Sequence, residues 1–195
     1  MPTFLFACFF SFAPELLGVG ILDWSARGSL LTFLFLNTFV LPSLCIYYPY
    51  RAKIVPDLFL TESKQRHWPY LITIGLYCVT IYLLQYRLSP ISEIAPRLAI
   101  CLLSTVVALI GVTIINKFWK ISAHATGIGG VIGALLYVSY TFNADTLLYP
   151  LLVSILLAGL IGSARLFLHA HTPWQIIAGM AVGLGSTITT FFFLF

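Results

Sequence analysis

Long apolar segments separated by short polar connections dominate the hydropathy pattern of this chain. Six segments are clear, and the first one in the chain is interrupted by Pro14 and Glu15. A membrane-spanning helix needs about 20 predominantly apolar residues. Lipid offers no partner for a free backbone amide, so such segments must be helical. In order, the segments cover approximately residues 3–21, 30–48, 70–86, 98–116, 126–142, 146–165 and 174–195.

The pattern inside the segments is helical and unlike that of a membrane β-barrel. Residues 100–115, ICLLSTVVALIGVTII, do not alternate between apolar and polar positions as barrel strands do. Tryptophan and tyrosine near several segment ends are typical of interface anchors. We therefore predict an all-α integral membrane protein, a bundle of six to seven transmembrane helices that forms a single domain over residues 1–195.

Composition supports this picture, because it excludes a soluble protein. Hydrophobic residues make up 60% of the chain and charged residues 8%, against about 25% charged residues in a typical soluble domain. The net charge of +4 indicates loop cations that set orientation or bind anions, and nucleic acid is not an expected partner. The four cysteines, Cys8, Cys45, Cys78 and Cys101, lie in different segments, and we expect them to be small buried side chains.

Three connections must share one face of the membrane, because every crossing changes sides. They are residues 50–69, 117–127 and 163–175, and we call their side the motif face. This face carries seven of the ten Lys and Arg residues and all four histidines: Arg51, Lys53, Lys64, Arg66, Lys117, Lys120 and Arg165, with His67, His124, His169 and His171. The opposite face has Arg27, Arg87 and Arg97.

Two explanations of this asymmetry stay open. Basic loops follow the positive-inside rule, which orients membrane proteins. That rule does not concern histidine, and it does not explain why Lys120, His124, Arg165 and His171 lie close to helix ends. Cations and imidazoles gathered at a membrane face are also suited to a bound phosphate. A pure ion channel has little support, because no segment carries a stripe of charge through its middle.

Two stretches resemble signatures of the type 2 phosphatidic acid phosphatase superfamily. That family has a serine–arginine start, a histidine six residues after the arginine and an aspartate four residues later. In SARLFLHAHTPWQ these positions fall on Ser163, Arg165, His171 and Gln175. In KISAHATG, Ser122 and His124 match the serine and histidine of a second signature, usually Ser-Gly-His. The resemblance covers residues 98–195, the expected phosphatase-like core, whereas residues 1–97 supply N-terminal helices and a basic loop.

The resemblance implies a membrane phosphohydrolase that needs neither metal nor cofactor. His171 would be the nucleophile that becomes a phosphohistidine, and His124 the general acid and then base. Cations and hydroxyls would hold the phosphate oxygens. The partners would be a lipid phosphate substrate and bilayer lipids, and the location a multi-pass position in the bacterial inner membrane. The expected phosphate-binding residues are Arg165, Lys120, Ser122, Arg66 and Lys117.

The chain departs from the family pattern at three points. Gln175 replaces the aspartate and orients the nucleophile without bringing charge. Ala123 replaces the glycine of the second signature. The family's first signature, a lysine followed seven residues later by Arg-Pro, is missing, and Lys64, Arg66, Lys117 and Lys120 are the cations available to replace it. Asp57 and Glu62 are candidate substitutes for the missing carboxylate.

These departures leave two functions open. The first is a lipid phosphatase, whose rate the missing carboxylate would lower. The second is a non-catalytic member of the same fold that binds or transports an anionic lipid. His169 either lines the site, caps a helix end or meets lipid headgroups. The glycines Gly127, Gly129 and Gly130 either cradle an anion with their amides or let helices pack closely, whereas Gly179 and Gly183 indicate packing.

Overall fold

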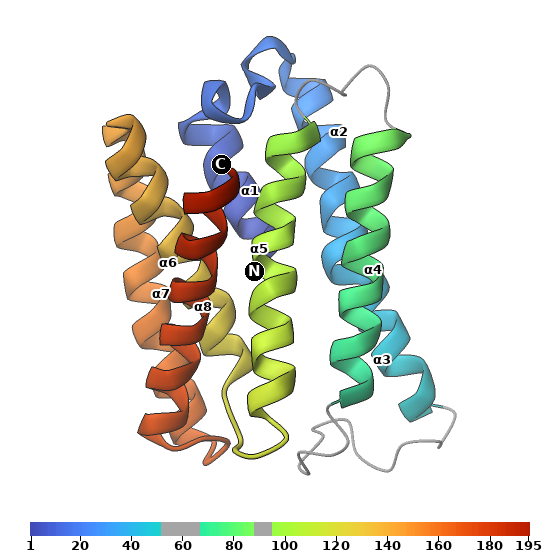
Figure 1. Ribbon diagram of the computed structural model, residues 1–195, viewed down its shortest axis with the longest axis vertical. Helices are drawn as coiled ribbons and strands as arrows, with labels where there is room; N and C mark the ends of the chain where they lie inside the picture. Colours follow the sequence, from blue (N-terminus) through green and yellow to red (C-terminus); the bar gives the residue numbers. More distant parts are fainter. Residues whose placement is uncertain (52–66, 88–94) are drawn as a thin grey trace.

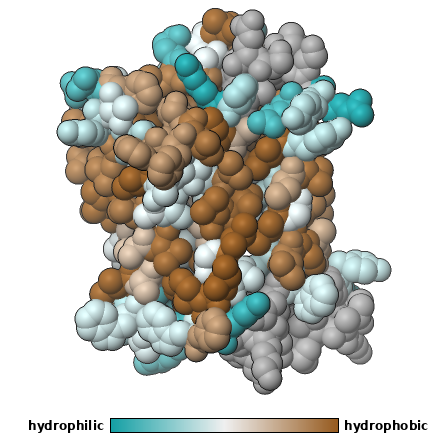
Figure 2. All heavy atoms as spheres, viewed as in Figure 1, coloured by the Kyte–Doolittle hydropathy of each residue, from teal (hydrophilic) through white to brown (hydrophobic). Residues whose placement is uncertain are grey.

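The computed structural model describes residues 1–51, 67–87 and 95–195, which form an upright bundle of long helices (Figure 1). Six helical stretches are long and apolar enough to cross a membrane. On the face shown in Figure 2, apolar side chains cover the middle of the bundle and hydrophilic ones gather towards its two ends. The prediction of an all-helical, multi-pass membrane protein is confirmed at this level. The helices are α1 (Pro2–Phe12), η1 (Pro14–Leu17), η2 (Val19–Ile21), α2 (Trp24–Phe35), η3 (Leu36–Val40), α3 (Leu41–Arg51), α4 (His67–Tyr86), α5 (Ala95–Ile115), α6 (Ala123–Phe142), η6 (Asp145–Leu147), α7 (Leu148–Phe167) and α8 (Pro173–Leu194).

The first apolar segment does not cross the bundle as one helix. Helix α1 has 11 residues and is about 16 Å long, half of a hydrocarbon core of about 30 Å. Pro14 disfavours helical geometry at Ala13, which has φ −149° and ψ 54°, and Gly18 then turns the chain in a left-handed conformation with φ 74°. The described residues therefore contain six candidate crossings. In Figure 1, α1 begins at mid-height and the C-terminus lies in the upper half.

A proline shapes the first full crossing, which runs continuously from Trp24 to Tyr48. Pro42 has no amide hydrogen, and its ring clashes with the carbonyl of the residue four positions earlier, Thr38. The helix widens there into the π-turn η3, in which the Leu41 amide bonds Leu36. The hydroxyl of Tyr77, on α4, donates to the released Thr38 carbonyl at 3.0 Å. The carbonyl that the proline leaves without a helical donor is thus hydrogen-bonded by a neighbouring helix.

Helix α5 stands at the centre of the bundle and packs against α4 on one side and α8 on the other (Figure 1). The closest helix pair is α6 with α8, and glycines allow their approach. A Cβ atom added at Gly183 would overlap the Thr126 carbonyl and lie 2.7 Å from the Gly130 amide nitrogen. One added at Gly179 would lie 2.6 Å from the Ser122 carbonyl oxygen. The packing role expected of Gly179 and Gly183 is confirmed.

The end of the bundle opposite the motif face is held by arginine side chains bonded to backbone carbonyls. The Arg27 guanidinium donates to Val19 at 3.0 Å and, at 2.9 Å each, to Leu22 and to Gly20. From α5, Arg97 donates to Leu16 at 2.8 Å. These bonds satisfy carbonyls of the two 3-10 turns, which lack regular helical partners.

The prediction of four buried cysteines is right for two of them. Cys8 and Cys101 are buried, Cys45 is half-buried and Cys78 is exposed on α4. Burial raises the pKa of the Cys8 thiol to about 11, because the thiolate would lose its hydration. Cys78 was misjudged because an apolar segment has an outer face as well as a packed one.

Candidate functional site

The end of α3, the start of α4 and the loops that join α5 to α6 and α7 to α8 lie at one end of the bundle, the lower end in Figure 1. The three predicted connections join α3 to α4, α5 to α6 and α7 to α8. Residues 52–66 of the first connection lie outside the described residues, and with them the candidates Lys53, Asp57, Glu62, Lys64 and Arg66. The described part of the site therefore rests on the second and third connections.

The starts of α6 and α8 are bonded directly to each other. The Ser122 amide donates to the Gln175 carbonyl at 3.3 Å, which joins the two sequence signatures through the backbone. The Ser122 hydroxyl is fully buried and caps α6 by accepting from the Ala125 amide at 3.4 Å. This role differs from the predicted phosphate contact, because the start of α6 is packed against α8.

The side chain of Gln175 holds the ring of His171. Its Oε1 atom accepts from the Thr172 amide at 3.1 Å, in a capping box at the start of α8. The same atom lies 3.1 Å from Nδ1 of His171. The Thr172 amide can only donate, so this oxygen is the acceptor, and Nδ1 of His171 must carry the hydrogen. Nε2 of the neutral ring is then the nitrogen with the lone pair.

The loop between α7 and α8 is shaped by His169, which ends α7. His169 has a left-handed backbone with φ 49°. Its amide bonds the Leu166 carbonyl at 2.9 Å, and the next amide, of Ala170, bonds the Arg165 carbonyl at 3.1 Å. These two bonds form a Schellman motif with His169 in the position that glycine usually takes. Of the alternatives for His169, the helix cap is confirmed.

Arg165 lies in the last turn of α7 and is half-buried. Within residues 1–51, 67–87 and 95–195, its guanidinium makes no hydrogen bond or ion pair. A cation in the last turn also interacts favourably with the helix dipole, which accounts for part of its placement. Lys120 is half-buried and Lys117 is exposed, both in the loop between α5 and α6.

His124 is the second residue of α6 and its side chain is exposed. It lines a cavity of about 190 Å³ between α1, α4, α5 and α6. Successive helical residues turn by about 100°, so His124 points away from the α8-facing positions Ser122, Ala125 and Gly129. His171 is not among the described residues that line this cavity. The structure therefore joins Ser122, Gln175 and His171 closely and places His124 on another side of α6.

The glycines of α6 are not an anion cradle. The helix begins at Ala123, three residues before the predicted segment, so the amides of Gly127, Gly129 and Gly130 lie beyond its first turn. Gly129 instead lies against the Met180 carbonyl of α8, where a Cβ atom would overlap. The packing alternative is the correct one for Gly129, because α6 starts earlier than its hydropathy indicates.

Charge is distributed unevenly within the described ranges. The motif face there has Arg51, Lys117, Lys120 and Arg165 and no carboxylate, whereas the opposite face has both signs. No cluster of three metal-ligating side chains occurs in the same ranges. The motif face is thus a cationic surface that also carries the imidazoles of His124, His169 and His171, which suits an anion chemically.

Comparisons of the chain with protein-family models, with curated proteins and with solved structures found no match. The resemblance to the phosphatase superfamily stays a prediction based on its short signatures.

Sequence reasoning missed the capping box formed by Thr172 and Gln175. The pattern Thr-Pro-Trp-Gln before an apolar run was a sufficient signal, since it matches a capping box with proline at the first helical position. The positioning role of the Ser122 amide had no such signal, because it depends on which helix packs against α6.

Proposed function

We propose that the protein is a membrane phosphohydrolase that removes phosphate from a lipid phosphate or lipid diphosphate through a phosphohistidine at His171. The bond between His171 Nδ1 and Gln175 Oε1 carries this proposal. It fixes the tautomer in which Nε2 has the lone pair needed to attack phosphorus. Fixing the tautomer is a large part of what a carboxylate does behind a catalytic histidine. A glutamine that is itself held by the Thr172 amide supplies that part.

In the first step, Nε2 of His171 attacks phosphorus. A P–N bond forms as the P–O bond to the lipid oxygen breaks. The leaving oxygen takes a proton from the His124 imidazolium, so the lipid departs as an alcohol or, from a diphosphate, as a monophosphate. Nδ1 of the phosphorylated ring keeps its hydrogen bond to Gln175.

In the second step, water attacks the phosphohistidine. Neutral His124 takes the proton of the water, the new P–O bond forms and the P–N bond breaks. The electron pair returns to Nε2 of His171 and inorganic phosphate leaves. Each histidine ends in the state in which it began, so the cycle balances without an added co-reactant.

The cations of the motif face stabilise the charge of the transferring phosphoryl group. Arg165 precedes His171 in the same connection and carries a guanidinium that the described residues leave available. Lys120 lies two residues before Ser122, whose amide is bonded to Gln175. We assign Ser122 the role of a positioning residue, since its hydroxyl caps α6. Lys117 and Arg66 are further candidate cations.

The direct test is phosphate release by purified protein from a panel of lipid phosphates and diphosphates. His171→Ala should lower the rate more than about 10³-fold, since removing a catalytic nucleophile costs at least that much. His169→Gly is the matched control, because His169 lies two residues away and its backbone caps α7. Release should continue in EDTA. A His171→Ala protein as fast as wild type would overturn the nucleophile assignment.

A second variant tests the missing charge. Gln175→Glu keeps the acceptor atom and the capping box, and it adds the carboxylate that stabilises an imidazolium. We expect about tenfold faster release, less than the full effect of a catalytic carboxylate, because the tautomer is already correct. Gln85→Glu, at an exposed position on α4, is the matched control. A slower Gln175→Glu protein would contradict this role of Gln175.

One observation favours the second candidate, a non-catalytic protein that binds or transports an anionic lipid. His124 lines a cavity to which His171 does not contribute. If wild-type protein binds a lipid phosphate but releases no phosphate from any member of the panel, this candidate replaces the hydrolase.

A further inference from the structure

The cavity beside His124 extends from the motif face into the bundle. At its outer end His124 is exposed, whereas Tyr77, Ala108 and Val112 on its wall are 5%, 6% and 0% exposed. Ala108 lies seven residues before the end of α5, a depth of about 10 Å along the helix axis. Leu109 of α5, Thr73 of α4 and Thr126 of α6 also line it.

The cavity wall is apolar in effect, although it includes hydroxyl groups. The hydroxyls of Tyr77, Thr73 and Thr126 donate to backbone carbonyls at 3.0, 2.7 and 3.1 Å. Their hydrogens are therefore not offered to a ligand. Among the described wall residues, His124 is the one with an imidazole, carboxylate, ammonium or guanidinium side chain, and Met1, which carries the chain's amino group, lies on the wall as well. The cavity thus combines a largely apolar interior with an imidazole at its exposed end.

We infer that this cavity binds the apolar chain of an amphiphile whose anionic head lies at His124. The volume of about 190 Å³ exceeds the roughly 150 Å³ of engineered apolar cavities that bind benzene. A slender chain of several methylenes fits that space. The inference rests on the proposed function, in which the chain is that of the lipid phosphate.

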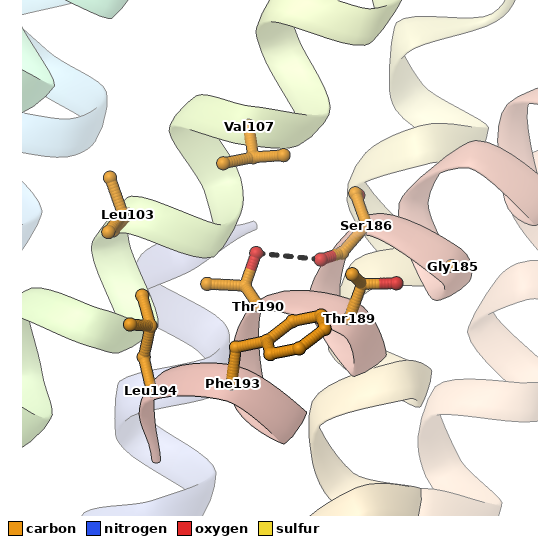
Figure 3. Close-up of a pocket in the computed structure, with 8 residues that line it drawn as sticks. All are labelled: Leu103, Val107, Gly185, Ser186, Thr189, Thr190, Phe193 and Leu194. Carbon is orange, nitrogen blue, oxygen red and sulfur yellow. Dashed lines mark hydrogen bonds between the residues drawn. The ribbon is translucent and has the colours of Figure 1, made fainter.

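A second cavity has the wrong chemistry for the same ligand. It measures about 390 Å³ and lies between α5 and α8, towards the end opposite the motif face (Figure 3). Two of its three hydroxyls are bonded to backbone carbonyls, that of Ser186 to Val182 at 2.7 Å and that of Thr190 to Ser186 at 2.8 Å. None of its lining residues is ionisable, so an anionic head would find no partner there. Gly185, on its wall, has open space around it and gives a matched control.

The experiment measures binding of monoalkyl phosphates with two, four, six and eight carbons, below their micelle concentrations, by calorimetry on detergent-purified protein. The His171→Ala background prevents turnover. Each buried methylene is worth about 0.8 kcal/mol, so affinity should rise about fourfold per carbon until the cavity is full. Ala108→Leu should end that rise at a shorter chain, and Leu109→Ala at a longer one. Gly185→Leu should leave the series as it is.

The outcomes separate this inference from the proposed function. The inference would be overturned if affinity did not depend on chain length. It would also be overturned if Gly185→Leu, and not Ala108→Leu, made the rise in affinity end at a shorter chain. Neither result would bear on the hydrolase. A chain-length series that shifts with Ala108→Leu in a protein that never releases phosphate would support the inference and refute the hydrolase. If Ala108→Leu does not purify as a single species, Leu109→Ala decides, because it changes the cavity in the other direction.

Discussion

The two ends of the bundle use their arginines in different ways. At the end opposite the motif face, Arg27 donates to three backbone carbonyls and Arg97 to one. Carboxylates lie on the same side, at Glu15, Asp23 and Asp145. At the motif face, Arg165 makes no hydrogen bond through its guanidinium within the described ranges, and those ranges hold no carboxylate there. The arginines opposite the motif face therefore stabilise the fold through backbone bonds, whereas Arg165 has no such bond among the described residues.

This difference separates the two explanations of the basic motif face. Orientation by the positive-inside rule requires cations in the loops and sets no condition on their contacts. It does not account for His171, whose tautomer is fixed by Gln175. The connection from residue 163 to residue 175 thus holds an arginine without a carboxylate partner among the described residues and an imidazole with a fixed orientation, and the positive-inside rule requires neither.

Within this comparison of the two ends, the largest effect is expected when Arg165 or Arg27 is replaced by alanine. Arg165→Ala should lower phosphate release about 10²–10³-fold, as loss of a donor to a developing anion does, and should change stability by less than about 1 kcal/mol. Arg27→Ala should leave release unchanged and destabilise the fold by about 1–3 kcal/mol, since it leaves carbonyls unsatisfied. Rates and thermal midpoints in one detergent measure both.

The same pair shows how the comparison fails. If Arg27→Ala lowers the rate as much as Arg165→Ala at equal stability, the two ends do not differ in function. If Arg165→Ala unfolds the protein, then Arg165 is a structural residue like Arg27.

An intermediate effect is expected at the contact between α6 and α8, which positions the motif face. Gly183→Ala places a Cβ atom against the Thr126 carbonyl and should cost about 1–3 kcal/mol, as overpacking does. It should also slow phosphate release, because the bond from Ser122 to Gln175 depends on that contact. Gly185→Ala, two residues away with open space around it, should change neither quantity. Equal effects of both substitutions would show that helix propensity, and not packing, is responsible.

The smallest effect is expected at His169. Its left-handed backbone costs a non-glycine residue roughly 1 kcal/mol, so His169→Gly should raise stability by up to that amount. Phosphate release should not change. A loss of activity without a loss of stability would return His169 to the site and weaken the distinction between caps and anion-binding groups on this face.

Hydropathy predicted most of the fold, because the membrane allows few alternatives. Six crossings, their order and the shared face of three connections all follow from apolar length and parity. The interruption of the first apolar segment at Pro14 and Glu15 was predicted, but the end of α1 at Phe12 was not. The start of α6 was placed three residues late, because Ala123 and His124 belong to a helix whose first turn is not markedly apolar.

The site was less predictable than the fold. The resemblance implied that Arg165, His171 and Gln175 act together, and of these the structure bonds His171 to Gln175. Spacing did not predict that Ser122 is buried, because burial depends on the glycines of another helix. Nor did it predict that His124 lines a cavity with residues of α1 and α4, since those helices are far away in sequence.

The bond from Tyr77 to Thr38 has a consequence for how this chain can change over generations. Pro42 leaves the Thr38 carbonyl without a helical donor, and the Tyr77 hydroxyl donates to it instead. We therefore expect the effects of substitutions at positions 42 and 77 on stability to be coupled, although the two residues lie on different helices. A lineage that first exchanges the proline regains an amide for the Thr38 carbonyl and can then lose the phenol at little cost. The reverse order passes through a buried carbonyl with no donor, and selection should block that route.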